Sequence, residues 1–134
     1  MDNVLTRFFE QLRGAGAGAD VPVRSELKKD ETLALRGTRT PTTDVFESDS
    51  QLLLVIDVPG CAREDIEIAL EGDTLTVRAP IGELDPGYAW QRSFALPRNI
   101  DAAKAHASWA LGVLKIELPR RKAEARRIPV SAAA

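Results

Sequence analysis

The stretch QLLLVIDVPGCAREDIEIALEGDTLTVRA, residues 51–79, decides the fold of this chain. It contains three short runs in which every second residue is apolar, the period of β-strands that turn one face toward a core. The positions expected to face the core are Leu52, Leu54, Ile56 and Val58, then Ile66, Ile68 and Leu70, then Leu75 and Val77. The breaks VPGC and EGDT have turn composition, and Gly72-Asp73 between two alternating runs indicates a short hairpin.

The same period continues downstream. In YAWQRSFALP, residues 88–97, one face carries Tyr88, Trp90, Phe94 and Leu96 with Arg92 among them. In VLKIELP, residues 113–119, one face carries Leu114, Ile116 and Leu118. Many short strands without long helices predict an all-β protein, an immunoglobulin-like antiparallel β-sandwich.

Three zones follow along the chain: an arm over residues 1–43, the sandwich over 44–119 and a tail over 120–134. In the arm, Leu5, Phe8 and Leu12 recur at helical spacing and Phe9 widens their face, which predicts a short amphipathic helix. GAGAGA at 14–19 should end this helix, because repeated glycine is costly to order. The polar stretch at 24–43 is expected to be mobile.

The overall composition of the chain limits the classes of function that it can have. The 134 residues make one domain, and a net charge of −2 argues against general binding to nucleic acid or to anionic membranes. Cys61 is the single cysteine, so an internal disulfide is excluded, which fits a reducing compartment. The N-terminus lacks the apolar run of a signal peptide, and the longest apolar run, residues 52–56, is too short to span a bilayer. A soluble, cytoplasmic protein is expected.

The residue types that carry catalysis are sparse. His106 is the single histidine, and neither it nor Cys61 has the sequence partners of a triad or a metal cluster. The acids Asp44, Glu47 and Asp49 cluster near one strand start, where charged side chains more commonly prevent unwanted strand pairing than act as acid and base. The sequence therefore predicts no enzyme, no cofactor and no metal site, which leaves binding as the activity.

The tail RRKAEARRIPVSAAA, residues 120–134, contains one apolar triplet. Pro129 holds the chain extended, so Ile128 and Val130 project in the same direction. No local core is available to bury them. We expect this triplet to dock into an apolar groove elsewhere.

Together these pieces resemble the small heat-shock proteins with an α-crystallin domain. The resemblance covers residues 41–130 and rests on PTTDVFESDSQLLLVIDVPGCAREDIEIALEGDTLTVRA, on R-x-F-x-L-P from Arg92, on A-x-x-x-x-G-V-L from Ala107, and on the IPV triplet, in that order. Two departures stand out. Leu111 occupies a turn position where the family favours asparagine or aspartate. The connection PIGELDPG, residues 80–87, is shorter than the loop that bacterial and plant members exchange between subunits.

The resemblance implies ATP-independent holding of unfolding client proteins by a homodimer, by a higher oligomer, or together with another small heat-shock protein. Clients would bind the apolar arm residues Val4, Leu5, Phe8, Phe9 and Leu12. The tail motif Ile128, Pro129 and Val130 would enter a groove between the strands at 65–70 and 103–109, lined by Ile66, Ile68, Ala105 and Ala107. Arg92 shares its strand face with apolar residues, so a carboxylate partner or a subunit boundary is expected nearby, and the resemblance places it at the dimer interface.

Two alternatives remain open at this stage. A co-chaperone-like sandwich would bind one defined partner rather than unfolded clients. The arm helix would equally well pack on its own sandwich as bind clients.

Overall fold

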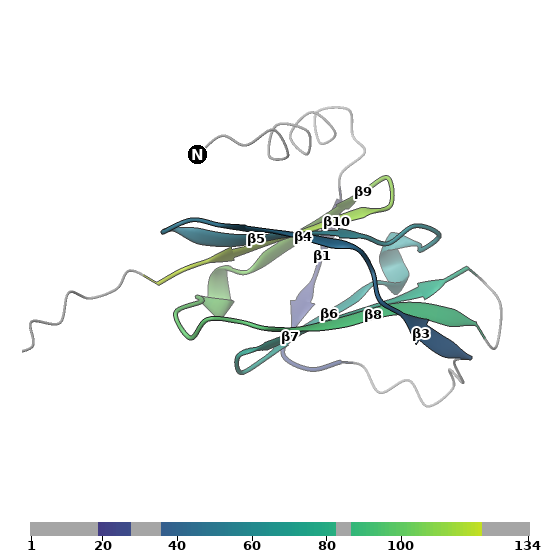
Figure 1. The fold of residues 1–134 in the computed structure, drawn as a ribbon, viewed down its shortest axis with the longest axis horizontal. Helices are drawn as coiled ribbons and strands as arrows, with labels where there is room; N and C mark the ends of the chain where they lie inside the picture. Colours follow the sequence, from purple (N-terminus) through teal and green to yellow (C-terminus); the bar gives the residue numbers. More distant parts are fainter. Residues whose placement is uncertain (1–18, 28–35, 83–86, 122–134) are drawn as a thin grey trace, which may run out of the picture.

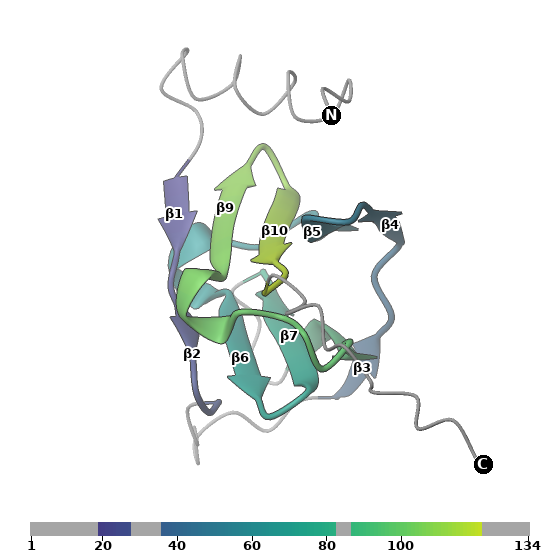
Figure 2. The same cartoon turned by 90° about the vertical axis from the view of Figure 1, so that its left-hand side faces the viewer.

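The computed structural model describes residues 19–27, 36–82 and 87–121, which form two five-stranded sheets packed face to face (Figures 1 and 2). The first sheet has the order β1 (Ala19–Val21), β9 (His106–Ala110), β10 (Val113–Pro119), β5 (Gln51–Asp57) and β4 (Thr43–Glu47). The second has the order β2 (Val23–Arg24), β6 (Glu67–Glu71), β7 (Thr74–Ile81), β8 (Tyr88–Ala95) and β3 (Gly37–Arg39). Two short 3₁₀ turns, η1 (Arg63–Asp65) and η2 (Ala102–Lys104), complete the described elements. The predicted all-β sandwich is confirmed.

Two pairings at the sheet edges depart from the expected antiparallel pattern. β2 pairs with β6 in parallel, and β3 pairs with β8 in parallel. Hairpins join neighbouring strands antiparallel, whereas these short strands are added at the edges by a chain that arrives from elsewhere in the sequence.

All three added strands, β1, β2 and β3, come from the segment 1–43 assigned to the arm. The sheets thus begin before residue 44, and residues 36–43 and Arg24 belong to ordered structure rather than to a mobile stretch.

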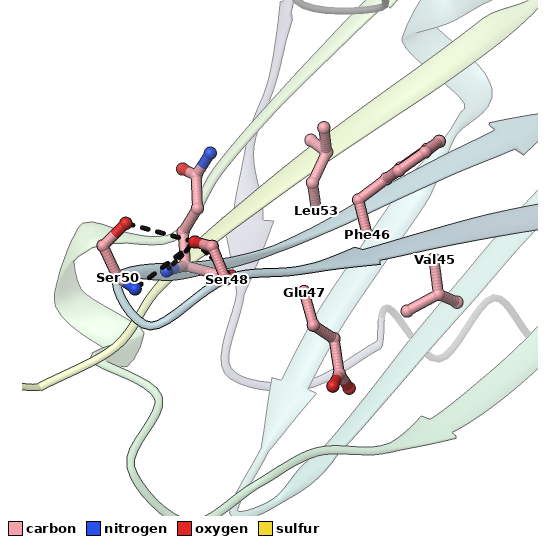
Figure 3. Close-up of a pocket in the computed structure, with 7 residues that line it drawn as sticks. Val45, Phe46, Glu47, Ser48, Ser50 and Leu53 are labelled. Carbon is pink, nitrogen blue, oxygen red and sulfur yellow. Dashed lines mark hydrogen bonds between the residues drawn. The ribbon is translucent and has the colours of Figure 1, made fainter. Parts of the chain in front are cut away.

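β5 is buried on both of its faces, although the sequence indicated one. Leu53 and Val55 point away from the second sheet and cluster with Ala110, and the half-buried Phe46 and Val113 pack against them. Figure 3 shows Leu53 and Phe46 projecting to one side of the β4–β5 pair and Val45 to the other. The first sheet therefore has an apolar outer face in addition to its core face.

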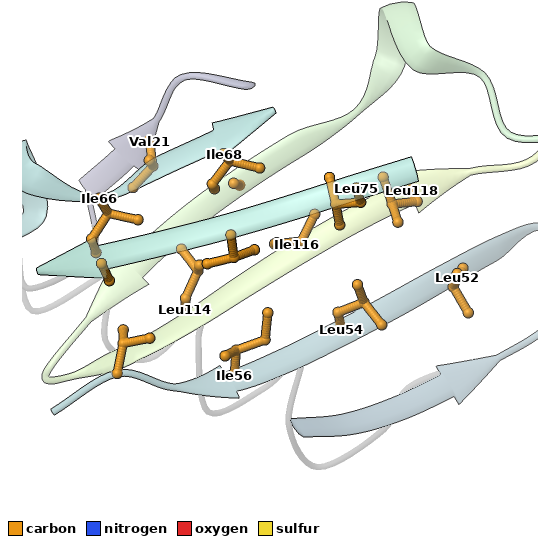
Figure 4. Packing of buried hydrophobic residues seen from close by; sticks show 14 of the residues in the cluster. Val21, Leu52, Leu54, Ile56, Ile66, Ile68, Leu75, Leu114, Ile116 and Leu118 are labelled. Atoms are coloured by element: carbon orange, nitrogen blue, oxygen red, sulfur yellow. The ribbon is translucent and has the colours of Figure 1, made fainter. Parts of the chain in front are cut away.

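The main core lies between the two sheets (Figure 4). Its largest completely buried aliphatic side chains come from positions predicted to face inward: Leu54, Ile56, Val58, Ile68, Leu75, Val77, Leu114, Ile116 and Leu118. Period-2 patterning is enough to place them, because successive strand residues alternate between faces. At the end of β8, however, Tyr88 is 40% exposed and its ring lies under the guanidinium of Arg39, 4.9 Å from the ring centroid. Tyr88 therefore belongs to the β3 edge rather than to the core.

The two tight hairpins form as predicted, each with a residue of positive φ. Gly72 has φ of 57° between the paired residues Glu71 and Thr74. Between Ala110 and Val113 the turn consists of Leu111, with φ of 49°, and Gly112, with φ of 78°. The β9–β10 hairpin thus survives the departure at Leu111.

Several predictions fall outside the described residues. These are the arm helix and its apolar residues Val4, Leu5, Phe8, Phe9 and Leu12, and the tail triplet Ile128, Pro129 and Val130.

Candidate functional site

The residues predicted to line a groove are brought together at one edge of the sandwich. Ile68 lies on β6 and Ala107 on β9, and both are buried. Ile66 follows η1 and is also buried, and Ala105 packs against the same cluster between η2 and β9. These four side chains all face the space where the two sheets meet. Their role as a docking site for the tail stays a prediction.

That place is filled by a segment of the same chain, Val21-Pro22-Val23. Val21 pairs with Ala107 of β9, and two residues later Val23 pairs with Ile68 of β6. One short stretch therefore bridges the edges of both sheets, and β1 and β2 follow one another along this edge in Figure 2. Val21 is only 3% exposed and lies among Ile66 and Ile68 in Figure 4.

Polar contacts hold the start of this segment. Arg63 of η1 donates through Nη1 to the backbone oxygen of Asp20, at 3.0 Å. His106 Nε2 lies 3.2 Å from the Asp20 carboxylate Oδ1. Both contacts are largely exposed, so each adds little free energy. The burial of Val21 and the two strand pairings provide the main anchorage.

The outer face of the first sheet is the second notable surface. Across it, Val55, Lys115 and Ser108 lie side by side on β5, β10 and β9. Lys115 and Ser108 are buried, and Lys115 Nζ is 2.9 Å from Glu117 Oε1. None of the described strands lies across this face (Figure 1). Alternation along β10 places Lys115 opposite the core, and no local sequence signal indicates its burial.

At the β4–β5 turn this outer face continues into a pocket of about 340 Å³ (Figure 3). Phe46 and Leu53 form part of its apolar lining, and Ser48, Ser50 and Glu47 contribute polar atoms. Ser48 Oγ accepts from the backbone N–H of Gln51 at 3.1 Å, which stabilises the turn. Ser48 has no basic side chain among its described hydrogen-bond partners, so the pocket resembles a binding depression more than a nucleophilic site.

Arg92 lies half-buried on β8. Its Nη1 donates to the backbone oxygen of Pro41 at 3.5 Å, and its guanidinium stacks 4.9 Å from the centroid of the Phe94 ring. The ion pairs within the described ranges do not include Arg92. Arg92 was expected to have either a carboxylate partner or a subunit boundary nearby. The described part of this subunit does not supply the carboxylate partner.

Residues considered for catalysis are spread apart. Burial, and secondarily the charge of Asp65, raises the pKa of the Cys61 thiol to about 11, and its Sγ donates to the backbone oxygen of Ala79 at 3.4 Å. A thiol held in the protonated form is a poor nucleophile at neutral pH. Asp44 and Glu47 are exposed on β4, an edge strand. Over residues 19–27, 36–82 and 87–121, no three His, Cys, Asp or Glu side chains are grouped to hold a metal ion.

Among the residues that the structure describes, no helix has the length and apolarity required to cross a bilayer.

The fold and this site define a β-sandwich that binds an extended apolar segment across the edges of both sheets. Comparison with known proteins agrees with this class. The Hsp20/alpha crystallin family pattern matches residues 44–131. The chain is 26% identical to Small heat shock protein C4 of Rickettsia felis over 69% of its length, and 30% identical to 18 kDa antigen 2 of Mycobacterium avium over 75%. These alignments cover 64% and 83% of the two relatives.

Solved structures give the same result. The crystal structure of a small heat-shock protein from Xylella fastidiosa superimposes with a TM-score of 0.55 at 31% identity, covering 69% of this chain and 96% of that one. The chain belongs to the Hsp20/alpha crystallin family, the small heat-shock proteins, whose members are chaperones rather than enzymes.

Proposed function

We propose that this protein is an ATP-independent holdase, which binds unfolding proteins and prevents their aggregation under heat or other stress. Family membership supports this proposal, and the observation that carries it is the apolar outer face formed around Leu53, Val55 and Ala110. Unfolding proteins expose apolar surface, and a holdase requires apolar surface that can be offered to them without loss of its own fold. In this proposal the outer face can be uncovered without disturbing the main core, because that core lies on the other face of the same sheet.

The arm supplies the adaptable part of the client site in this proposal. Its apolar residues are joined to β1 through GAGAGA, and a tethered set of such side chains can adapt to varied clients. In the absence of client, the outer face of the first sheet is the natural place for these residues to rest.

Assembly forms the other half of the proposal. In this proposal the subunits form a homodimer with Arg92 at the interface, where the partner provides the carboxylate that the described part of one subunit does not. The tail triplet, Ile128 to Val130, then links dimers by entering the groove between β6 and β9 of a neighbouring subunit, or of a second small heat-shock protein. Burial of these two side chains is worth roughly 3–6 kcal/mol before ordering costs, which suits reversible assembly. A cytoplasmic location is proposed because the single cysteine, Cys61, cannot form an internal disulfide, which fits a reducing compartment.

The test is light scattering of heat-labile clients. At near-stoichiometric ratios, the purified protein should slow the aggregation of at least two unrelated clients, equally with and without ATP. Protection of only one protein, through a stable complex before heating, would instead support a co-chaperone-like module with a defined partner. Failure with every client would contradict the holdase.

The arm is tested by replacing Phe8 and Phe9 with serine. This variant should protect clients several-fold less well while its unfolding midpoint stays near that of the parent, because GAGAGA separates the arm from the strands. Leu111→Ala is the matched control, since it removes an exposed apolar side chain at the far end of β9 and should not raise the stability. If the arm variant protects clients as well as the parent does, clients bind the sandwich rather than the arm.

A further inference from the structure

The groove between β6 and β9 is occupied by a sequence of the same type as the tail triplet. Val21-Pro22-Val23 and Ile128-Pro129-Val130 each place two β-branched residues on either side of a proline. In the described segment Val21 is buried, Pro22 is exposed and Val23 is half-buried. The fixed φ of proline keeps such a segment extended, so its two flanking side chains are presented together at low entropic cost.

We infer that residues 19–24 are an internal occupant of this groove, which must leave before the tail of a second copy can dock there. This inference rests on the proposed function in one respect, the docking of the tail at this groove. It adds that two segments compete for the groove, the tail triplet and residues 19–24 of the chain that forms the groove.

Strand pairing makes the two occupants mutually exclusive. In the first sheet β9 already has β10 on one side, so β1 takes its remaining edge through Ala19, Asp20 and Val21. In the second sheet β6 has β7 on one side, and β2 takes its other edge. A strand has two edges, so neither β9 nor β6 can pair with another segment while 19–24 is in place.

The internal segment has two advantages over the tail. It is part of the same chain, and short tethers give effective concentrations in the millimolar range, well above the concentration of another subunit's tail. Its flanking residue also has partners at the site, because the Asp20 carboxylate lies 3.2 Å from His106 Nε2 and Arg63 donates to the Asp20 backbone oxygen. A tail bound in the same direction would bring Arg127 to that position, close to Arg63. Tail docking at this groove is therefore weak until 19–24 is released.

A reversible lock on the internal segment tests the inference. Asp20 and Ser108 are directly opposite on antiparallel strands, a spacing that a disulfide can bridge. The full chain would carry Asp20→Cys, Ser108→Cys and Cys61→Ser, with Ile128→Gly and Val130→Gly so that its own tail does not compete. The probe is a fluorescein-labelled peptide RRIPVSAAA, residues 126–134, and the readout is fluorescence anisotropy with the same protein oxidised and then reduced.

The reduced protein should bind the peptide at least about tenfold more tightly than the oxidised protein, because only the reduced form can release the segment. Equal affinity for the two forms would overturn the inference, since the peptide would then dock elsewhere. Circular dichroism of both forms checks that the sandwich is intact.

A second variant avoids the disulfide. Val21→Ala with Val23→Ala, in the chain with the glycine-substituted tail, should bind the peptide about tenfold more tightly than that chain with both valines, since it shortens the competing side chains. Lack of peptide binding by every one of these proteins would overturn both the inference and tail docking in this groove. Client protection in the scattering assay is read separately, so the holdase proposal would stand or fall on its own result.

Discussion

Leu111 holds a backbone conformation that its side chain disfavours. Its φ is 49° and its side chain is 70% exposed, so no packing compensates for the left-handed geometry. Leu111→Asn should therefore raise the free energy of unfolding by about 1 kcal/mol, because asparagine tolerates this conformation better. Urea unfolding measures the change.

The control for this prediction is Leu111→Ala. Alanine removes the exposed side chain but keeps the strained backbone, so stability should not rise. If alanine and asparagine raise the free energy of unfolding equally, the exposed side chain of Leu111, and not its backbone conformation, is the destabilising feature.

Cys61 provides a second prediction for a single side chain. Its pKa of about 11, against an ordinary 9.0, lowers the thiolate fraction about a hundredfold near pH 8. Alkylation by iodoacetamide at pH 8 should accordingly be about a hundredfold slower in the folded protein than in urea. Mass spectrometry of timed samples measures both rates, and equal rates would show that the thiol is not protected.

The same shift has a consequence for stability. Because the folded state favours the protonated thiol, Cys61 contributes stability below the unfolded-state pKa near 9, and this contribution is lost as the pH rises toward about 11. Cys61→Ser should show a smaller fall in stability over that interval.

At the scale of one strand, β5 separates two apolar surfaces. Leu54 and Leu53 are almost equally buried, at 1% and 2% exposure, but Leu54 lies between the sheets and Leu53 on the outer face. Leu54→Ala should cost roughly 3–4 kcal/mol, as expected for a cavity enclosed by two layers. Leu53→Ala should cost roughly 1–2 kcal/mol, because its cluster in the described residues comes from one sheet.

Urea unfolding of the two alanine variants provides the comparison. If Leu53→Ala proves as costly as Leu54→Ala, the outer face is a permanent part of the folded unit. It would then be unsuited to exchange with clients, and the holdase proposal would depend on the arm alone.

For the whole molecule, the assembly should depend on the tail and the fold should not. β10 ends at Pro119, and Arg120 makes a single bridge to Ile100, so the triplet at 128–130 follows the last strand. Ile128→Gly with Val130→Gly should shift the mass toward a dimer and leave the thermal midpoint almost unchanged. Light scattering coupled to size exclusion measures the mass.

Glycine also loosens the chain, so Ser131→Gly with Ala133→Gly is the matched control. This control should keep the parent's mass distribution. An unchanged mass in the Ile128/Val130 variant, at all concentrations, would mean that the triplet does not assemble the protein.

The sequence by itself determined the inner core of this molecule. Leu54, Ile68 and Leu114 could be assigned because alternation along a strand fixes which side chains share a face, whatever lies across from them. The hairpins at Gly72 and Gly112 followed from turn chemistry in the same local way. The groove residues, Ile68 and Ala107 among them, were named from family resemblance, and the structure places them together.

Only the tertiary structure decided what fills the groove and which strand has two buried faces. Val21-Pro22-Val23 and Ile128-Pro129-Val130 are locally alike, so no pattern could tell which of them reaches β6 and β9. That choice depends on where the chain enters the sandwich, and residues 19–24 run along the edge that the groove opens to. The sequence likewise did not predict the burial of Leu53 and Lys115. Alternation indicates which side chains share a face, but it does not indicate what covers the opposite face.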